Sequence, residues 1–153
     1  MVSVKRMHLS DCARVARMIQ TTVKQSYADL FPKKLIVFFV KKYTVETMKI
    51  RMNRGPFWIA IENEKIIGCI ALVNNEMRTF FVHPKYQKKG VGSALYKRFL
   101  KEVKQKNIKK IYLDASPVAE SIYAHWEFKK IRRIPRKDAG ITYSYMRMVK
   151  KIS

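Results

Sequence analysis

A short glycine-containing segment, QKKGVG at residues 87–92, is the part of the sequence best suited to bind a phosphate group. Gly90 and Gly92 are separated by one residue, which lets the backbone turn tightly and approach a ligand closely. A helix is expected to begin there, and the unpaired N–H groups of a helix N-terminus favour an anion. Lys88 and Lys89 add positive charge. The segment therefore predicts a pyrophosphate cradle, with an ordinary strand-to-helix loop as the alternative.

Two common phosphate-binding motifs do not describe this segment. No Gly-Lys-Ser/Thr follows it, which excludes a P-loop. The third glycine of the dinucleotide fingerprint is absent, and the preceding strand is expected to belong to an antiparallel meander. The three histidines and two cysteines show no metal-ligand spacing, so no metal site is predicted.

The elements that must position this segment follow from the hydrophobic period of the sequence. Alternating or continuously apolar runs predict strands at residues 2–7, 57–62, 65–73, 76–82, 111–115, 128–133 and 141–149. Apolar residues at helical spacing predict helices over residues 10–30, 32–51, 92–105 and 117–125. Within the second of these, residues 35–40 would also serve as a strand. A strand, a helix and a further strand in succession imply a parallel pair with a crossover helix.

The predicted order is β-α-α-β-β-β-α-β-α-β-β, which is an α/β (α+β) chain with a mixed sheet and helices on both faces. The sequence has 153 residues, 48% of them hydrophobic, and is expected to form one domain over residues 1–153. The N-terminus lacks the apolar stretch of a signal peptide, and no run approaches the ~20 apolar residues of a membrane span. Cys12 and Cys69 lie in core-like segments and are expected to be reduced, buried thiols of a cytoplasmic protein.

The charge balance is strongly basic, with 33 Lys and Arg residues against 11 Asp and Glu residues and a formal net charge of +22. Such an excess attracts anions, including phosphates, nucleic acid and acidic proteins. No RNA- or DNA-reading motif is present, so nucleic acid is a possible partner that the motifs do not favour. No membrane partner is expected, and a homodimer is left open.

Two blocks of sequence resemble the GCN5-related N-acetyltransferase (GNAT) family. FVHPKYQKKGVGSAL at residues 81–95 looks like its acetyl-CoA signature, whose core is Gln/Arg-x-x-Gly-x-Gly/Ala. ASP at 115–117 and SIYAHWEF at 121–128 are similar to its second block, in which a helix ends in Tyr before a Gly-Phe pair. The predicted order of elements is also the family's. The resemblance implies a twisted, mostly antiparallel sheet with a central splayed parallel strand pair, and an N-acetyltransferase that uses acetyl-CoA and no metal.

The resemblance also implies which residues hold the co-substrate. The backbone of Phe81 and Val82 would hydrogen-bond the pantetheine arm and the acetyl carbonyl. Ser116 stands where many members carry an Asn that touches coenzyme A, and a hydroxyl can make part of that contact. The pyrophosphate would be held by the segment made of Gln87, Lys88, Lys89, Gly90, Val91, Gly92 and Ser93.

The reaction so implied is direct attack of a neutral primary amine on the thioester in a ternary complex. Tyr123 occupies the family's position for the acid, because a phenol of pKa ~10 can donate to a thiolate whose thiol has pKa ~8.5. Glu76 resembles the base position of the histone-acetylating branch. It lies six residues before Val82, so strand alternation predicts that both face the same side. The alternatives are a core tyrosine and a solvated strand-end carboxylate.

Two positions depart from the residues that the family's members carry. Glu127 replaces the usual Gly before Phe128, and a non-Gly residue there costs of order 1 kcal/mol, so an altered helix end is expected. Ile111 stands where the branch that acetylates ribosomal-protein N-termini has a carboxylate, which disfavours that branch.

The acceptor is left open between a small-molecule amine and a protein amine. In the family it is set by the regions corresponding to residues 27–57 and the loop 134–141. The positive field of this chain fits acidic or amphipathic amines better than polyamines. A basic, nucleic-acid-associated binding protein with a GNAT fold is the alternative function.

Overall fold

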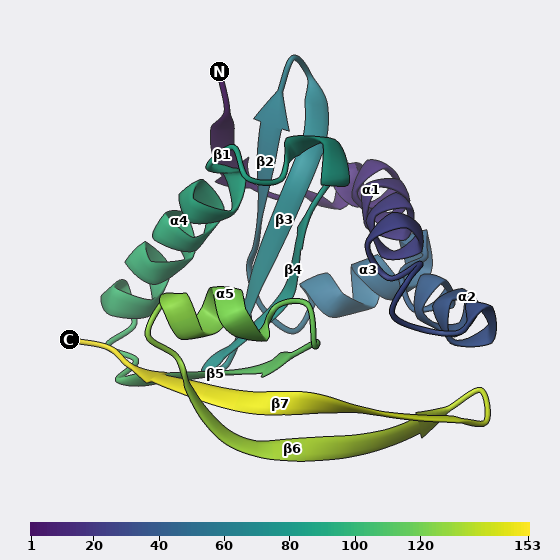
Figure 1. Cartoon of the computed structure of the whole chain (residues 1–153). Helices are drawn as coiled ribbons and strands as arrows, with labels where there is room; N and C mark the ends of the chain where they lie inside the picture. Colours follow the sequence, from purple (N-terminus) through teal and green to yellow (C-terminus); the bar gives the residue numbers. More distant parts are fainter.

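One twisted sheet of seven strands forms the centre of the molecule in the computed structural model, which describes residues 1–153 (Figure 1). The strands are β1 (Ser3–Arg6), β2 (Phe57–Glu62), β3 (Lys65–Val73), β4 (Glu76–Val82), β5 (Lys110–Ala115), β6 (Lys129–Asp138) and β7 (Ile141–Lys151). They lie in the order β1-β2-β3-β4-β5-β7-β6, and every neighbouring pair is antiparallel except β4 and β5. The predicted fold class, a mixed and mostly antiparallel sheet with one parallel pair, is confirmed.

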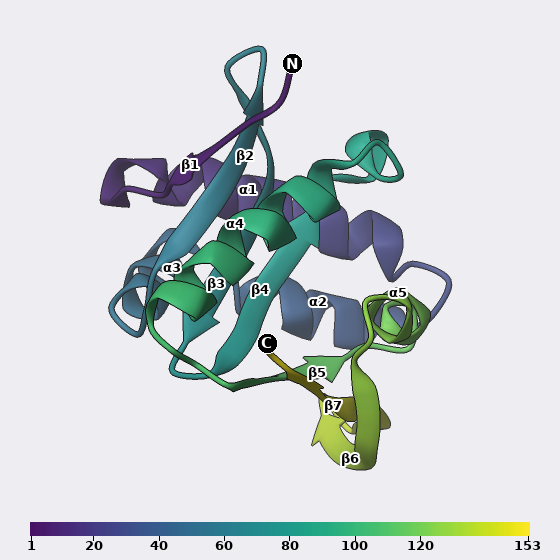
Figure 2. The same cartoon turned by 90° about the vertical axis from the view of Figure 1, so that its left-hand side faces the viewer.

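Helices cover both faces of this sheet. They are α1 (Cys12–Ser26), α2 (Lys33–Lys41), α3 (Val45–Met52), α4 (Val91–Gln105) and α5 (Glu120–His125), with short 3-10 turns at Leu9–Asp11 and Pro84–Tyr86. Figure 2 shows α4 in front of the sheet and α1 behind it. The core is accordingly divided into a cluster under α4 and a cluster under α1, α2 and α3. None of the helices combines the length and the apolar character needed to cross a membrane.

The region predicted as one helix over residues 32–51 forms two helices. The apolar run at 35–40 is helical because Leu35 and Phe39, four residues apart, are both buried on one side of α2. Thr44 then adopts an extended conformation, and its hydroxyl accepts a hydrogen bond from the Thr47 amide at 3.2 Å. This N-cap starts α3 as a separate helix. Gln20 of α1 donates from its side-chain amide to the carbonyl of Tyr43, the residue before Thr44, at 2.6 Å.

The region 134–141, expected to be a loop, is the end of a long hairpin. Strand β6 continues through Pro135, which pairs with Ser144, to Asp138. Because β6 is the last strand of the sheet, a proline without an N–H group is tolerated there. The turn at Ala139 and Gly140 has two positive φ angles, 52° and 73°, as a tight hairpin requires.

Strand β4 contains a β-bulge that changes which side chains share a face. The register with β3 shifts between the Cys69–Phe81 and Ala71–Arg78 pairs, and Thr79 has a φ of 51°. The fully buried Cys69 thiol donates to the Thr79 carbonyl at 3.2 Å inside the bulge.

Because of this bulge, Glu76 and Val82 do not follow simple strand alternation. Met77 and Val82 both contact the cluster under α4, although they are five residues apart. Glu76 contacts Arg147 of β7, whose neighbours Met146 and Met148 belong to that same cluster, so Arg147 projects from the other face. The prediction that Glu76 and Val82 share a face is therefore wrong.

Helix α5 ends as a Gly-containing member would, in spite of Glu127. That residue adopts a φ of 70°, and the Phe128 amide donates to the Tyr123 carbonyl at 2.9 Å. This is the hydrogen bond of a Schellman-type helix end. The expected alteration of the helix end is not found, and the strain is carried by Glu127 itself.

Replacing Glu127 by glycine is therefore expected to stabilise the fold. Relief of the left-handed strain, less the added chain entropy of glycine, should raise the free energy of unfolding by roughly 0.5–1 kcal/mol. For a chain of this size, 1 kcal/mol shifts Tm by about 2–4 °C, so we expect Tm to rise by about 1–4 °C. Thermal unfolding followed by circular dichroism measures this shift. Glu46→Gly, in the first turn of α3, is the control and should lower Tm. An unchanged or lower Tm for Glu127→Gly would contradict the strain argument.

Candidate active site

The parallel strands β4 and β5 separate almost as soon as they meet. Their register contains one pair, Glu76 with Tyr112, and the Tyr112 amide donates to the Asn75 carbonyl at 2.9 Å. Beyond this point β4 and β5 diverge (Figure 1). The edge of β4 that faces β5 is thus left without a strand partner toward Val82, and its backbone groups other than the Val82 carbonyl, which Gln87 contacts, are available to a ligand.

The hydrogen-bonding pattern indicates which residues present their backbone at this open edge. Phe81 pairs with Cys69, and two residues later the His83 amide donates to the Ile67 carbonyl at 2.8 Å. Because ladder bonds alternate along an antiparallel strand, the backbone of Phe81 faces β3 and that of Val82 faces the open edge. Phe80 has no register partner on β3 because of the bulge. Sequence reasoning missed Phe80, since nothing in its residue type marks a bulge.

The glycine segment lies at one end of this edge, where α4 begins. Gly90 is the residue before α4 and has a φ of 85°, which glycine adopts without strain. The first intrahelical bond runs from the Ala94 amide to the Gly90 carbonyl at 3.1 Å, so the amides of the preceding turn have no helix partner. A Cβ added at Gly92 would lie 3.5 Å from the Phe80 ring and 3.8 Å from the Val82 side chain. Side chains at this position would therefore enter the space between α4 and β4.

The polar residues before Gly90 are arranged around the same place. Gln87 donates from Nε2 to the Val82 carbonyl at 2.9 Å, which ties the segment to the end of β4. Lys88 and Lys89 are exposed. Val91 is buried and anchors the start of α4, whereas Ser93 is exposed beside the free amides. The predicted pyrophosphate segment and the end of β4 are thus brought together.

Tyr123 lies against the open edge from the side of α5. Its ring centroid is 6.4 Å from that of Phe80, 6.2 Å from that of Trp126 and 5.8 Å from that of Phe128. Burial, and secondarily the neighbouring Tyr27, raise the pKa of Tyr123 well above its usual value. The phenol is therefore fully protonated at neutral pH, which is the state that a proton donor needs. Ser116 lies beside Tyr27, which itself neighbours Tyr123.

Glu76 is held in an ion-pair network on the α1–α3 side. Its carboxylate accepts from Arg78 at 2.9 Å and from Arg147 at 2.7 Å, and Arg147 also contacts Asp114 at 3.1 Å. Partial burial raises the pKa of Glu76, but the hydrogen bonds and charges of Arg147 and Arg78 outweigh it, so the pKa lies below its usual value. Such a carboxylate accepts a proton less readily, and these contacts favour a role in orienting the two arginines.

On the side of α1–α3, aromatic side chains gather between the helices and the hairpin. Tyr43 packs on Phe81 with ring centroids 5.4 Å apart, and Tyr143 packs on Phe31 and Phe39 at 5.9 and 5.4 Å. Three of these rings, Phe31, Phe39 and Tyr43, come from the region 27–57, which the family resemblance implicated in acceptor choice, whereas Tyr143 lies just beyond the loop 134–141. Nothing in the sequence distinguishes these aromatic residues individually as site residues. No three His, Cys, Asp or Glu side chains are grouped so as to hold a metal ion.

Known proteins resemble this chain in sequence and in fold. Residues 25–150 match the family model described as Acetyltransferase (GNAT) domain. An uncharacterized N-acetyltransferase of Escherichia coli, YafP, is 26% identical over 138 residues, which cover 89% of this chain and 85% of that protein. A GCN5-related N-acetyltransferase structure from Rhodopseudomonas palustris gives a TM-score of 0.90 at 18% identity, covering 98% of this chain and 95% of that one. The PaiA N-acetyltransferase of Thermoplasma acidophilum, solved with coenzyme A, gives 0.75 at 18% identity over 99% of both chains.

Proposed function

This chain belongs to the GNAT acetyltransferase family, and on that premise we propose that it transfers an acetyl group from acetyl-CoA to a primary amine by direct attack in a ternary complex. The observation that carries the proposal is the open edge of β4 next to the free amides at the start of α4. An unpaired strand edge offers hydrogen bonds to an extended amide-containing arm, and a helix N-terminus offers them to a pyrophosphate. Both partners occur in coenzyme A, and in that order.

The residues that would hold the co-substrate follow from this arrangement. Val82, and in place of Phe81 the newly identified Phe80, would bind the pantetheine arm and the acetyl carbonyl through their backbone. Ser116 would contact coenzyme A from the opposite wall. The pyrophosphate would be bound by the backbone and charges of the segment Gln87, Lys88, Lys89, Gly90, Val91, Gly92 and Ser93. Acetyl-CoA supplies the activated thioester, and the chain supplies its position and the protons.

Tyr123 is proposed as the acid that protonates the departing thiolate. Its packing on Phe80 supports this role, because it places the phenol beside the strand edge proposed to bind the thioester. The same burial that raises the pKa of Tyr123 would also raise that of a thiol at this place, which keeps proton transfer feasible. Glu76 is left out of proton transfer, because its carboxylate is committed to Arg78 and Arg147.

We also propose a single domain over residues 1–153 and a cytoplasmic location. Both core clusters lie on the two faces of one sheet, which supports one domain. Both cysteines are free and buried, which is the state expected of thiols in a reducing compartment. Nucleic-acid binding is not proposed, since the positive charge has a sufficient use in attracting coenzyme A and an anionic acceptor.

The experiment that tests the function is an acetyl-CoA turnover screen over amino acids, polyamines, aminoglycosides and peptides. Thiol release is followed continuously, and mass spectrometry identifies the acetylated product. We expect release of coenzyme A that depends on one class of amine, with an N-acetyl product. A folded protein that transfers acetyl to none of these amines would contradict the proposal.

A further inference from the structure

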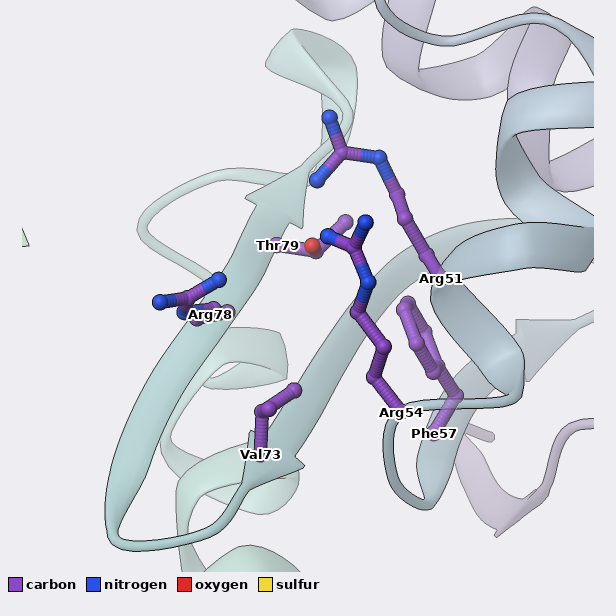
Figure 3. A pocket seen from close by; sticks show the side chains of 6 residues that line it. All are labelled: Arg51, Arg54, Phe57, Val73, Arg78 and Thr79. Atoms are coloured by element: carbon purple, nitrogen blue, oxygen red, sulfur yellow. The ribbon is translucent and has the colours of Figure 1, made fainter.

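Three arginines surround a small recess on the α1–α3 side of β4 (Figure 3). Arg51 comes from α3, Arg54 from the loop after it and Arg78 from β4. The recess is shallow and open to solvent, with a cavity volume of about 10 Å³, and its lining is completed by Phe57, Val73 and Thr79. In Figure 3 the guanidinium groups of Arg51 and Arg54 lie over β4 near Thr79, whereas Arg78 points away from them.

Two of these three arginines have no carboxylate partner in the protein. Arg78 is paired with Glu76 at 2.9 Å. None of the nine ion pairs in the chain includes Arg51 or Arg54. Arg51 Nε is buried without a hydrogen-bond partner, and the Arg51 guanidinium otherwise reaches the Lys42 carbonyl at 3.5 Å. Unpaired buried donors and adjacent like charges both cost free energy, and a bound anion would relieve both costs.

A chain of contacts joins this recess to the open edge of β4. The Arg51 guanidinium lies 4.6 Å from the centroid of the Tyr43 ring, which packs on Phe81 at 5.4 Å. Phe81 stands between the two residues whose backbone is proposed to bind the thioester. Thr79, which lines the recess, belongs to the bulge directly before them. An acceptor that approaches β4 from the α1–α3 side can therefore reach Arg51 and Arg54 at the mouth of the recess.

We infer that the acceptor is a small amine that carries a carboxylate or phosphate group, and that Arg51 and Arg54 bind this group at the mouth of the recess beside Thr79. The inference rests on the proposed acetyl transfer and names its substrate class. Guanidinium groups suit this task because their planar donors match the paired oxygens of a carboxylate or phosphate. The same positive charges would repel a polyamine, which offers no anionic group.

The test uses pairs of amines that differ in the anionic group. Lysine is compared with cadaverine, phenylalanine with phenethylamine, and phosphoethanolamine with ethanolamine, so that the carboxylate and phosphate arms are separate. We expect kcat/KM to be at least about tenfold higher for the anionic member of one or more pairs, as charge-assisted hydrogen bonds predict. Arg51→Gln and Arg54→Gln should remove that advantage by raising KM for the anionic amine, with kcat little changed.

Arg17→Gln, on the exposed side of α1, is the matched control and should keep the preference. Coenzyme A affinity, measured by calorimetry, checks that each variant is folded. Because the Arg54 side chain is exposed, its replacement should not disturb the fold. Equal kcat/KM within every pair, or a preference that both arginine variants retain, would overturn the inference while acetyl transfer stands. Failure of wild type to acetylate any of these or the earlier amines, with coenzyme A still bound, would instead overturn the proposed function on which the inference rests.

Discussion

Tyr123→Phe is expected to lower kcat about a hundredfold and to leave KM for acetyl-CoA nearly unchanged. The phenylalanine ring keeps the contacts with Phe80, Trp126 and Phe128, so the end of α5 and the wall of the site should be preserved. Only the proton for the departing thiolate is removed. The measurement is kcat with the best acceptor from the screen, under conditions in which the chemical step limits turnover.

Glu76→Gln is the matched variant that tests whether Glu76, rather than Tyr123, takes part in proton transfer. If the glutamate only orients Arg78 and Arg147, its replacement should reduce kcat much less than Tyr123→Phe does. A Tyr123→Phe enzyme within about twofold of wild type would identify Tyr123 as a packing residue and remove it from the mechanism. A larger loss for Glu76→Gln than for Tyr123→Phe would restore the glutamate as the base.

Gly92→Glu is expected to weaken coenzyme A binding at least tenfold, or by ~1.4 kcal/mol. Its side chain would start 3.5 Å from the Phe80 ring and grow into the space between α4 and β4. It would also bring a negative charge to the helix end proposed to bind the pyrophosphate. Calorimetric titration of coenzyme A into the folded variant measures the effect directly.

Two further variants are controls for the effect of Gly92→Glu. One adds the same charge far from the proposed site, and the other changes a neighbouring glycine without adding a charge. Gln105→Glu adds the same charge at the far end of α4 and should leave affinity unchanged. Gly90→Ala meets no neighbouring atom within 4 Å but must adopt a φ of 85°, so its main effect should be on stability. Unchanged affinity in a folded Gly92→Glu protein would refute the cradle.

The fold was predictable because its determinants are local. The strands β2 and β3 of the meander follow from short, continuously apolar runs, and α4 follows from the spacing of Leu95, Phe99 and Val103, all fully buried. The glycine segment between them was recognisable because Gly90 occupies a backbone conformation that other residues avoid. The sequence reveals residues whose place is fixed by an unusual backbone conformation or by a regular hydrophobic period.

The errors arise where tertiary structure overrides the local pattern. The bulge reverses strand alternation at Thr79, a β-branched residue with a φ of 51° that no glycine announces, so Glu76 and Phe80 were misplaced or missed. The arginine recess also escaped prediction. Its members come from α3, a loop and β4, and only folding brings them together.

The buried thiol under the bulge gives the active strand a built-in reporter. Burial raises the pKa of Cys69 to about 12, so the sulfur is protonated and shielded from alkylating reagents while β3 and β4 remain paired. A reagent can modify it only after the sheet opens at this place. The rate of labelling at Cys69 therefore measures how often the strand that carries the proposed thioester contacts comes apart, and a ligand laid along β4 would slow that rate in proportion to its occupancy.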